Sequence, residues 1–307
     1  MSETKSTAKE FMVGAAGGIT QVMIGQPFDI VKVRMQVQAN RSAVQVARDI
    51  WKNEGALAFY KGTLPPLLGV GACISIVYST NHTITQFLQS SNSNPNSNAQ
   101  GHPLSTPQIF LSGGLAGLAN SFVSGPTEHI RIRLQTQSSN TSTSLANTHT
   151  VNAKPYNGVL SCIRHITTHA GIPGLYRGQV PTMLREFGSY GVWFSVYGYL
   201  ISRLTAPSST SSPQENAIPK WKTATCGGLT GVVLWGANYP FDVVKSKMQA
   251  DGFGAQQKYR GMRDAIRQTW RSQGVTGFYR GVGTAMGRAV PVCAGTFVVV
   301  EMVRGYM

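Results

Sequence analysis

The ten residues PFDIVKVRMQ at positions 27–36 return as PTEHIRIRLQ at 126–135 and as PFDVVKSKMQ at 240–249. Each copy holds a proline, an acid two positions later, a base three beyond the acid, a second base two further on, and a glutamine at its end. Recurrence of this kind indicates a chain built by repetition of one supersecondary motif. We therefore divide the sequence into three repeats, at residues 1–100, 101–215 and 216–307.

Two further landmarks keep the same register in every copy. A pair of glycines precedes each proline at a constant distance, and an aromatic–basic–glycine triplet follows it. The pairs are Gly14 and Gly18, Gly113 and Gly117, and Gly227 and Gly231; the triplets are Tyr60-Lys61-Gly62, Tyr176-Arg177-Gly178 and Tyr279-Arg280-Gly281. Polar segments at 90–103, 138–153 and 207–219 are typical of linkers and of a disordered surface loop.

Each repeat predicts a long helix, a short connecting segment and a second long helix. The expected long helices are 11–38, 63–88, 106–137, 180–203, 219–249 and 282–304. Each could span a membrane core, which needs about 20 residues. Polar residues interrupt all of them, which favours helices with one face on lipid and the other on an aqueous cavity. We expect the paired glycines to allow close helix packing and the repeated prolines to kink the first helix of each repeat.

The composition narrows the class of protein. Charged residues make up 13% of the chain, whereas about 25% is usual in soluble domains. The 27 basic and 12 acidic residues give a net charge of +15, which suits an anionic partner. The sequence has neither zinc-finger spacing nor an aromatic-rich RNA-binding motif, so we expect that the protein does not bind nucleic acid. The four cysteines form no CxxC pair, so we predict no metal site and interpret them as packing residues: Cys73, Cys162, Cys226 and Cys293.

Catalytic motifs are missing from the sequence. It contains no Walker loop, no GxSxG, no HExxH and no EF-hand loop. We therefore predict that the protein is not an enzyme and needs no cofactor. A chain of long membrane helices is typical of a transporter, a membrane channel or a structural membrane protein. A channel or a structural protein would not need charged gates at both ends of a cavity, whereas a transporter would.

The repeated charges predict a gate. The acid and the first base of each motif lie on the same face of a helix, where a local pair would contribute a few tenths of a kcal/mol. Recurrence in three repeats favours a ring instead, in which each acid bonds the base of another repeat. The expected pairs are Asp29–Arg131, Glu128–Lys245 and Asp242–Lys32, and Gln36, Gln135 and Gln249 could brace the ring by hydrogen bonding.

These three motifs and triplets resemble those of the mitochondrial carrier family (solute carrier family 25) over residues 11–305. The resemblance implies six transmembrane helices in a pseudo-threefold bundle, in the mitochondrial inner membrane, with short helices on the matrix side. It also implies alternating access to a central substrate site and a monomeric protein. Cardiolipin is the lipid implied at the triplets and at the Tyr156-Asn157-Gly158 and Tyr259-Arg260-Gly261 turns, where helix N-termini could bind its phosphates.

The chain departs from the family pattern in its second gate. The family carries an acid and a base three apart near the end of each even-numbered helix. Here Glu301 and Arg304 fit that pattern, whereas the second helix has His82 and Thr85, and the fourth has Gly198 and Ile201. We therefore expect a weak cytoplasmic network and a low barrier to outward opening.

A break in the threefold pattern predicts the substrate site. The residues seven positions after each triplet glycine are Gly69, Arg185 and Arg288. A buried charge near the membrane centre costs about 2.5–3.5 kcal/mol, so it normally has a task or a partner. Arg185 could pair structurally with its neighbour Glu186 or with Glu301. Alternatively, Arg185 and Arg288 could hold a carboxylate while Glu186 meets a cation, an arrangement that suits a zwitterion.

The pair Arg185–Glu186 resembles that of the carnitine, ornithine and basic amino acid branch, and of fungal mitochondrial amino acid carriers. Gly69 and Val70 bring no acid to the second helix, which argues against a dibasic substrate. We therefore predict antiport of a small or neutral amino acid, with carnitine esters as the second possibility. Ser189 completes the predicted site, with Asn120, Trp193, Trp235 and Asn238 as further lining; His129 is interpreted as structural.

Overall fold

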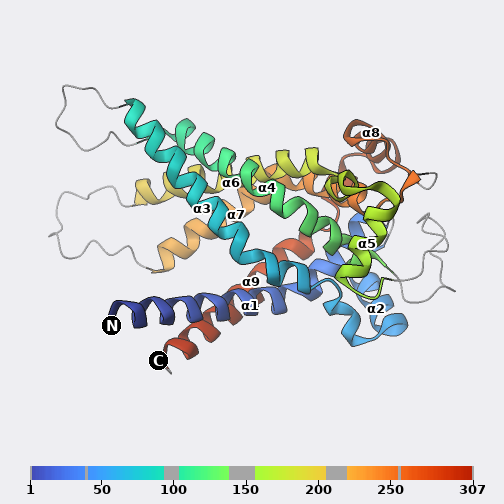
Figure 1. Cartoon of the computed structure of the whole chain (residues 1–307), viewed down its shortest axis with the longest axis horizontal. Coiled ribbons are helices and arrows are strands. Elements are labelled where there is room, and N and C mark those ends of the chain that lie inside the picture. Colours follow the sequence, from blue (N-terminus) through green and yellow to red (C-terminus); the bar gives the residue numbers. More distant parts are fainter. Residues whose placement is uncertain are drawn as a thin grey trace. The chain divides into compact units, whose positions relative to one another are not determined.

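The computed structural model describes residues 2–38, 41–92, 104–137, 156–204, 220–254 and 257–305. Within these ranges the chain is helical and contains no strand (Figure 1). A long helix, a short helix, a 3-10 helix and a second long helix follow one another three times. The elements are α1 Ser2–Val37, α2 Ala43–Glu54, η1 Ala56–Tyr60, α3 Leu64–Asn92, α4 Thr106–Thr136, α5 Val159–Ala170, η2 Ile172–Tyr176, α6 Gln179–Leu204, α7 Lys220–Ala250, α8 Met262–Gln273, η4 Val275–Tyr279 and α9 Val282–Gly305.

The predicted long helices are confirmed. Helices α4, α6, α7 and α9 begin and end within one residue of the expected ranges. Helix α1 begins at Ser2 rather than at residue 11, and α3 ends at Asn92 rather than at 88. The polar segments predicted as linkers and loop at 90–103, 138–153 and 207–219 lie outside the described residues, apart from 90–92 at the end of α3.

The aromatic–basic–glycine triplets are the turns between the short and long helices. Each tyrosine ends a 3-10 helix, and each glycine follows with a positive φ, of 77° at Gly62, 78° at Gly178 and 85° at Gly281. A residue with a Cβ is strained in this left-handed region, whereas glycine adopts it freely. The triplet therefore ends in glycine in every repeat because the turn into α3, α6 and α9 requires it.

The contacts within the chain divide it into two compact units. Unit 1 contains α1 and α9, all the short helices, and the ends of α3, α4 and α7 that border them; it comprises Met1–Gly71, Ser124–Gly178 and Val243–Met307. Unit 2 contains α6 and the remaining parts of α3, α4 and α7; it comprises Ala72–Val123 and Gln179–Asp242. Helices α3, α4 and α7 thus contribute to both units.

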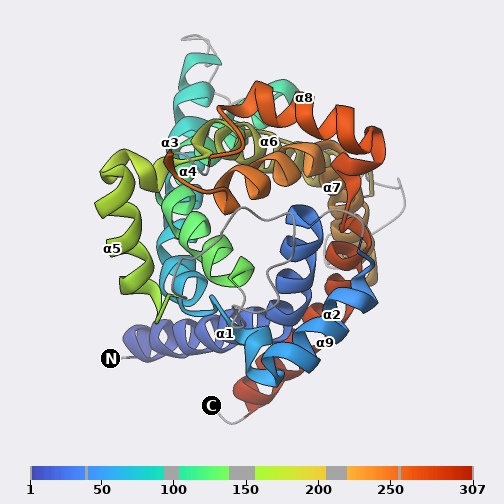
Figure 2. The same ribbon diagram turned by 90° about the vertical axis from the view of Figure 1, so that its right-hand side faces the viewer.

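Unit 1 has three equivalent apolar clusters, one for each repeat. In each, the last turns of a long helix pack against a short helix, and Figure 2 shows α2, α5 and α8 surrounding the ends of α1, α4 and α7. Burial of each valine, leucine, isoleucine, methionine or phenylalanine in these clusters stabilises the fold by about 1.5–3 kcal/mol. The buried members are Ile30, Val31, Val46, Ile50 and Ala58; Ile130, Leu134, Cys162 and Ile166; and Val244, Met248, Ala265 and Phe278.

The interpretation of the cysteines as packing residues holds for two of the four. Cys162 lies in the second cluster, where burial raises the pKa of its thiol to about 11 despite the opposing effect of Arg133. Cys226 is also buried, whereas Cys73 is half-buried and Cys293 is exposed. Cys162 is therefore a neutral packing residue, and Cys293 does not serve as one.

Helices α1 and α9 lie side by side in unit 1 (Figure 1). A Cβ added at Gly17 would lie 3.1 Å from Val300, and one added at Gly295 would lie 2.1 Å from the Cδ1 atom of Ile24. Each helix thus presents a glycine to a branched side chain of the other. This close approach involves Gly17 and not the predicted pair Gly14 and Gly18, which have open space around them.

In unit 2 the predicted close packing occurs in the second repeat. A Cβ at Gly113 would lie 2.6 Å from the carbonyl oxygen of Tyr190, and one at Gly117 would lie 2.4 Å from that of Glu186. Helices α4 and α6 therefore touch backbone to backbone. The equivalent Gly227 and Gly231 of α7 have no atom within 4 Å of an added Cβ. The expectation that all three glycine pairs serve close packing is wrong for the first and third repeats.

Long apolar surfaces run along the helices. Two described segments, Ala56–Ser91 and Val275–Val303, are long and apolar enough to span a membrane on composition alone. Large apolar side chains on the long helices point outward, among them Leu68, Phe87 and Val290 with exposed fractions of 73%, 68% and 75%. Such exposure is unfavourable in water and is typical of a surface that contacts lipid.

Candidate functional site

A pocket of about 250 Å³ lies between α6 and α7 in unit 2. Its walls come from one face of each helix, because the lining positions recur at intervals of one, three and four residues. The residues are Arg185, Glu186, Ser189, Tyr190 and Trp193 of α6, and Leu234, Trp235, Asn238 and Asp242 of α7. Three aromatic side chains and an ion pair therefore share one small cavity, which is typical of a site for a compact polar ligand.

Arg185 and Glu186 form an ion pair in this pocket. The Nη2 atom of Arg185 donates to Oε1 of Glu186, and the side-chain exposed fractions are 16% and 6%. The amide of Asn120 donates to the other carboxylate oxygen of Glu186 at 3.0 Å. Asp242 adds a second carboxylate, with its Oδ1 3.9 Å from Nε of Arg185. Charges this well shielded from water interact much more strongly than surface charges.

Two glycines, one on α4 and one on α6, allow close packing around Glu186. Gly117 of α4 contacts the Glu186 backbone directly, as described above. On the other side, Gly188 of α6 faces Asn238 of α7, whose Oδ1 atom would be 2.1 Å from an added Cβ. The backbone of α6 is therefore held between two neighbours at the level of the ion pair. The predicted site residues Arg185, Glu186 and Ser189 are brought together here, as are the predicted lining residues Asn120, Trp193, Trp235 and Asn238.

Two of the three predicted gate pairs form within unit 1. Arg131 donates to Asp29 at 2.7 Å, and Lys245 donates to Glu128. Both pairs join different repeats, so these charges form the predicted inter-repeat contacts and not local pairs. The third pair, Asp242–Lys32, involves one residue from each unit and stays a prediction.

Asp29 has more partners than the sequence indicates. Arg131 also donates to the side chain of Gln26 at 2.7 Å, and Arg288 donates to Asp29 at 3.1 Å. The sequence did not predict a role for Gln26, because the equivalent positions of the other repeats hold Gly125 and Tyr239. Arg288, predicted for the substrate site, thus lies on a gate pair of unit 1.

The remaining predicted positions belong to unit 1, whereas the pocket belongs to unit 2. Gly69 and Val70 belong to unit 1, where a Cβ at Gly69 would lie 3.6 Å from Thr127. A shared role of Gly69, Val70 and Arg288 with Arg185 stays a prediction. Of the second gate, Glu301 is exposed, and the side chain of Arg304 lies outside the described part of the chain.

The glutamine brace stays a prediction. Within the described residues, the buried amide groups of Gln135 and Gln249 have no hydrogen-bond partner. Their side chains pack instead against triplet glycines: a Cβ at Gly62 would lie 3.3 Å from Gln135, and one at Gly178 would lie 3.0 Å from Gln249. The glutamines therefore fill the space beside the turn of another repeat.

The second base of the first motif, Arg34, has a role that the sequence did not indicate. In repeat 1, Arg34 makes two hydrogen bonds to Glu54, of 2.5 and 3.0 Å, and Lys61 of the triplet donates to the same carboxylate at 2.5 Å. Burial alone would raise the pKa of Glu54, but the hydrogen bonds from Arg34 and Lys61 outweigh it and lower that pKa. Glu54 is therefore ionised and ties α2 to α1 and to the triplet.

His129 is buried at the end of α4 within unit 1. Arg133 donates from Nε to Nε2 of His129 at 2.9 Å, and Nδ1 lies 3.1 Å from the carbonyl oxygen of Leu175. With Nε2 accepting, Nδ1 carries the proton and donates to Leu175. This geometry is that of a residue that joins α4 to η2, in keeping with the structural interpretation.

A sequence model described as mitochondrial carrier protein matches residues 3–92, 102–208 and 216–307. Three repeats of a transport family account for nearly the whole chain, and the members of that family are transporters and not enzymes. The chain belongs to the mitochondrial carrier family.

Curated relatives are similar along almost their full length. The glutamate/glycine mitochondrial carrier ymc1 of Schizosaccharomyces pombe is 38% identical, over 98% of this chain and 95% of the relative. The mitochondrial glycine transporter YMC1 of Saccharomyces cerevisiae is 37% identical, over 96% and 90%. The human mitochondrial basic amino acids transporter is 35% identical, over 97% and 90%. These names support mitochondrial amino acid transport.

Proposed function

We propose that this protein is a multi-pass transporter of the mitochondrial inner membrane that exchanges a small zwitterionic amino acid by alternating access. Six described helices are 24 residues or longer, which exceeds the ~20 residues that a membrane span requires. Their exposed apolar side chains and the threefold recurrence of the short-helix clusters support six spans in a pseudo-threefold bundle. Polar positions on the same helices explain why composition alone selects two.

The observation that carries the proposal is the shielded pair Arg185–Glu186 in the unit 2 pocket. A free amino acid bears an α-carboxylate and an α-ammonium group. The substrate carboxylate can bind Arg185 while the substrate ammonium binds Glu186. Arg185 and Glu186 then each exchange their bond to one another for a bond to the substrate. No charge is left unpaired in a water-poor site, where an uncompensated charge would cost several kcal/mol. The pair is thus suited to a zwitterion and poorly suited to a simple anion.

The neighbouring groups favour a compact ligand. A volume of about 250 Å³ is below the usual range for drug-sized ligands, about 300–1,000 Å³. It fits a small amino acid better than a long acyl ester of carnitine, which stays the other candidate of this branch. A basic amino acid is a second candidate, because Asp242 adds a carboxylate that a second cation could use.

Counter-exchange in liposomes tests the proposal. Purified protein would be reconstituted into vesicles loaded with unlabelled glycine or glutamate, and uptake of labelled glycine, glutamate, lysine and carnitine would be measured. We expect saturable uptake of glycine or glutamate that depends on the internal amino acid. Conductance without saturation would support a channel, and uptake of carnitine alone would overturn the amino acid assignment. Uptake by a folded Arg288→Ala variant equal to wild type would remove Arg288 from the substrate site.

We also propose that a groove in unit 1 binds cardiolipin. It has a volume of about 620 Å³ and is lined by the triplet Tyr60-Lys61-Gly62 and by the turn Tyr156-Asn157-Gly158. The first turn of α5 has no side-chain cap at Gly158, so its first N–H groups are suited to binding an anion. A lipid with two phosphates and four acyl chains suits a basic groove bordered by apolar side chains.

The variant Asn157→Asp tests the cardiolipin groove. A carboxylate at the start of α5 favours the helix by about 0.3–1 kcal/mol but repels phosphate. We expect an unchanged or slightly higher melting temperature in detergent alone, and loss of most of the increase that added cardiolipin gives the wild type. Equal cardiolipin stabilisation of both proteins would place the lipid elsewhere.

A further inference from the structure

Glu54, the acid that joins Arg34 and Lys61 in repeat 1, has no counterpart in repeat 2. Glu54 precedes the Gly55 that ends α2, and the equivalent position before Gly171 holds Ala170. The two bases that Glu54 joins in repeat 1 have counterparts in repeat 2, which are Arg133 on α4 and Arg177 in the triplet. Both counterparts are buried or nearly so. Two shielded guanidinium groups without a nearby anion would be strongly destabilising.

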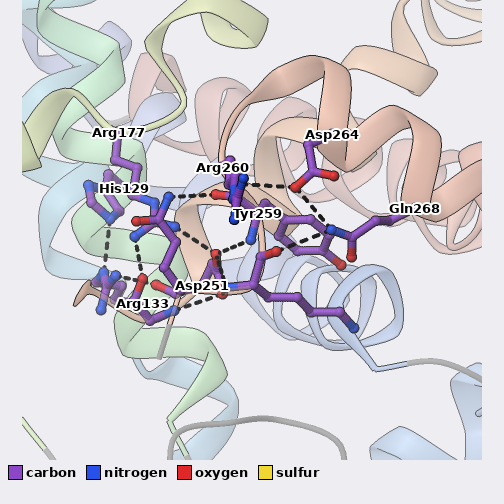
Figure 3. Close-up of polar contacts among 11 residues, drawn as sticks. His129, Arg133, Arg177, Asp251, Tyr259, Arg260, Asp264 and Gln268 are labelled. Atoms are coloured by element: carbon purple, nitrogen blue, oxygen red, sulfur yellow. Dashed lines mark hydrogen bonds and ion pairs between the residues drawn. The ribbon is translucent and has the colours of Figure 1, made fainter. Parts of the chain in front are cut away.

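Asp251, which follows α7 in repeat 3, meets these two bases. Arg177 donates from Nη2 to the Asp251 carboxylate at 2.6 Å, with side-chain exposed fractions of 12% and 6%. Arg133 donates to the backbone carbonyl of Asp251 at 2.5 Å, and Arg177 donates to that of Gly252. Figure 3 shows Arg133 and Arg177 reaching Asp251 from the side of repeat 2. All these residues belong to unit 1.

The Asp251 carboxylate is fixed by its own loop. It accepts hydrogen bonds from the backbone N–H groups of Gly252, Lys258 and Tyr259, at 2.9–3.0 Å. Burial, together with Asp251 and Asp264, raises the pKa of the Tyr259 side chain to about 12. Burial lowers the pKa of Arg177, and the charge of Asp251 opposes that shift. A carboxylate with this many donors is held in place by its own loop.

The ring of Phe253 adds a second contact between the repeats. Phe253 packs in the apolar cluster of repeat 2, and its centroid lies 4.0 Å from the guanidinium carbon of Arg133 and 5.3 Å from that of Arg177. Such cation–π contacts gain strength when they are shielded from water. The segment after α7 is therefore docked on repeat 2 by its carboxylate, by two carbonyl oxygens and by an aromatic ring.

We propose that Asp251 is a positioning residue that takes the place of the absent acid of repeat 2 and clamps the ends of α4 and α7 together. The gate pair Glu128–Lys245 joins the same two helices, and Arg133 and Asp251 lie one to two turns further along them. The clamp therefore holds these helices in the register that the gate pair needs. Its role in transport rests on the proposed function, whereas the contact itself can be tested without it.

A double-mutant cycle on purified protein tests the contact. The variants are Asp251→Asn, which keeps an oxygen for the loop N–H groups, Arg177→Gln, and both together. We expect each single variant to lower the melting temperature by roughly 5 °C or more, and the double variant to be no worse than the poorer single one. Additive losses would show that Asp251 serves its own loop and not repeat 2, and would overturn the proposal. Asp49→Asn, in a partly exposed ion pair with Arg41, is the matched control and should change little.

A rescue separates the charge of the clamp from its connection between repeats. Ala170→Glu, added to Asp251→Asn, restores the arrangement that Glu54 makes inside repeat 1. We expect the melting temperature to recover while the maximal exchange rate stays at least about fivefold below wild type with KM unchanged, because α4 and α7 are no longer joined. Recovery of both quantities would overturn the clamp. If the wild type exchanges nothing, the proposed function fails, and the melting-temperature cycle still decides the Asp251 contact.

Discussion

Exchange of the labelled amino acid is expected to fall at least about 100-fold in the variant Glu186→Gln. Glutamine keeps the shape of the side chain and an oxygen that can accept from Asn120. It removes the carboxylate that Arg185 contacts most closely, while that of Asp242 lies 3.9 Å from Nε of Arg185. It also offers no carboxylate at position 186 to the substrate ammonium. Removing one member of a shielded ion pair costs about 3–5 kcal/mol, which corresponds to more than a hundredfold in an equilibrium constant. The measurement is uptake into loaded liposomes.

The double variant Arg185→Gln/Glu186→Gln separates lost folding from lost binding. Removal of both charges leaves neither one unpaired, so its melting temperature should lie closer to wild type than that of Glu186→Gln. Uptake should stay absent, because neither charge of the zwitterion finds its partner. Uptake by the double variant at the wild-type rate would mean that the pair is structural. The variant Asp49→Asn, whose carboxylate lies in a partly exposed ion pair with Arg41, serves as the control for loss of one acid.

Gly117→Ala is expected to lower the melting temperature by roughly 2–5 °C, while the same change at the equivalent Gly231 or Gly18 has little effect or a small stabilising one. At Gly117 the new Cβ would lie 2.4 Å from the backbone oxygen of Glu186, which a helix cannot move aside cheaply. Overpacking of this kind typically costs about 1–3 kcal/mol. At Gly18 and Gly231 nothing lies within 4 Å, and alanine is the better helix former by about 1 kcal/mol.

The three alanine variants form their own controls, because they change the same position of three repeats. Thermal unfolding of the detergent-purified proteins gives the comparison. Gly117→Ala should also impair exchange, since α6 carries Arg185 and Glu186 past the point of contact. Equal melting temperatures for the three variants would show that the close approach of α4 and α6 does not support the fold.

Repetition in the sequence predicted most of the fold. The six long helices fall where the motifs, triplets and linkers predict them, because helix length and turn chemistry are local properties that each repeat specifies again. The gate pairs Asp29–Arg131 and Glu128–Lys245 were predictable for a related reason. Charges that recur at one position in every repeat meet one another when equivalent helix ends lie close together.

Features that depend on a single neighbour were not predictable in this way. Gly117 packs closely and Gly231 does not, although both occupy the same position of a repeat. Asp251 sits where the other repeats have Gln38 and Gln137, so the motif gives it no role. Its role depends on Ala170, more than 80 residues away, which lacks the acid that repeat 1 has. The sequence shows the missing acid, but it does not show which side chain takes its place.

The contacts of Asp29 have a consequence for how a solute approaches the carrier. One carboxylate there meets two guanidinium groups, those of Arg131 and Arg288, so this group of three carries one surplus positive charge. A cluster with such an excess, in surroundings that screen poorly, attracts negatively charged groups over a longer range than a neutral ion pair does. We expect it to draw metabolites in with their carboxylates leading, so that raising the ionic strength slows capture of acidic amino acids more than of neutral ones.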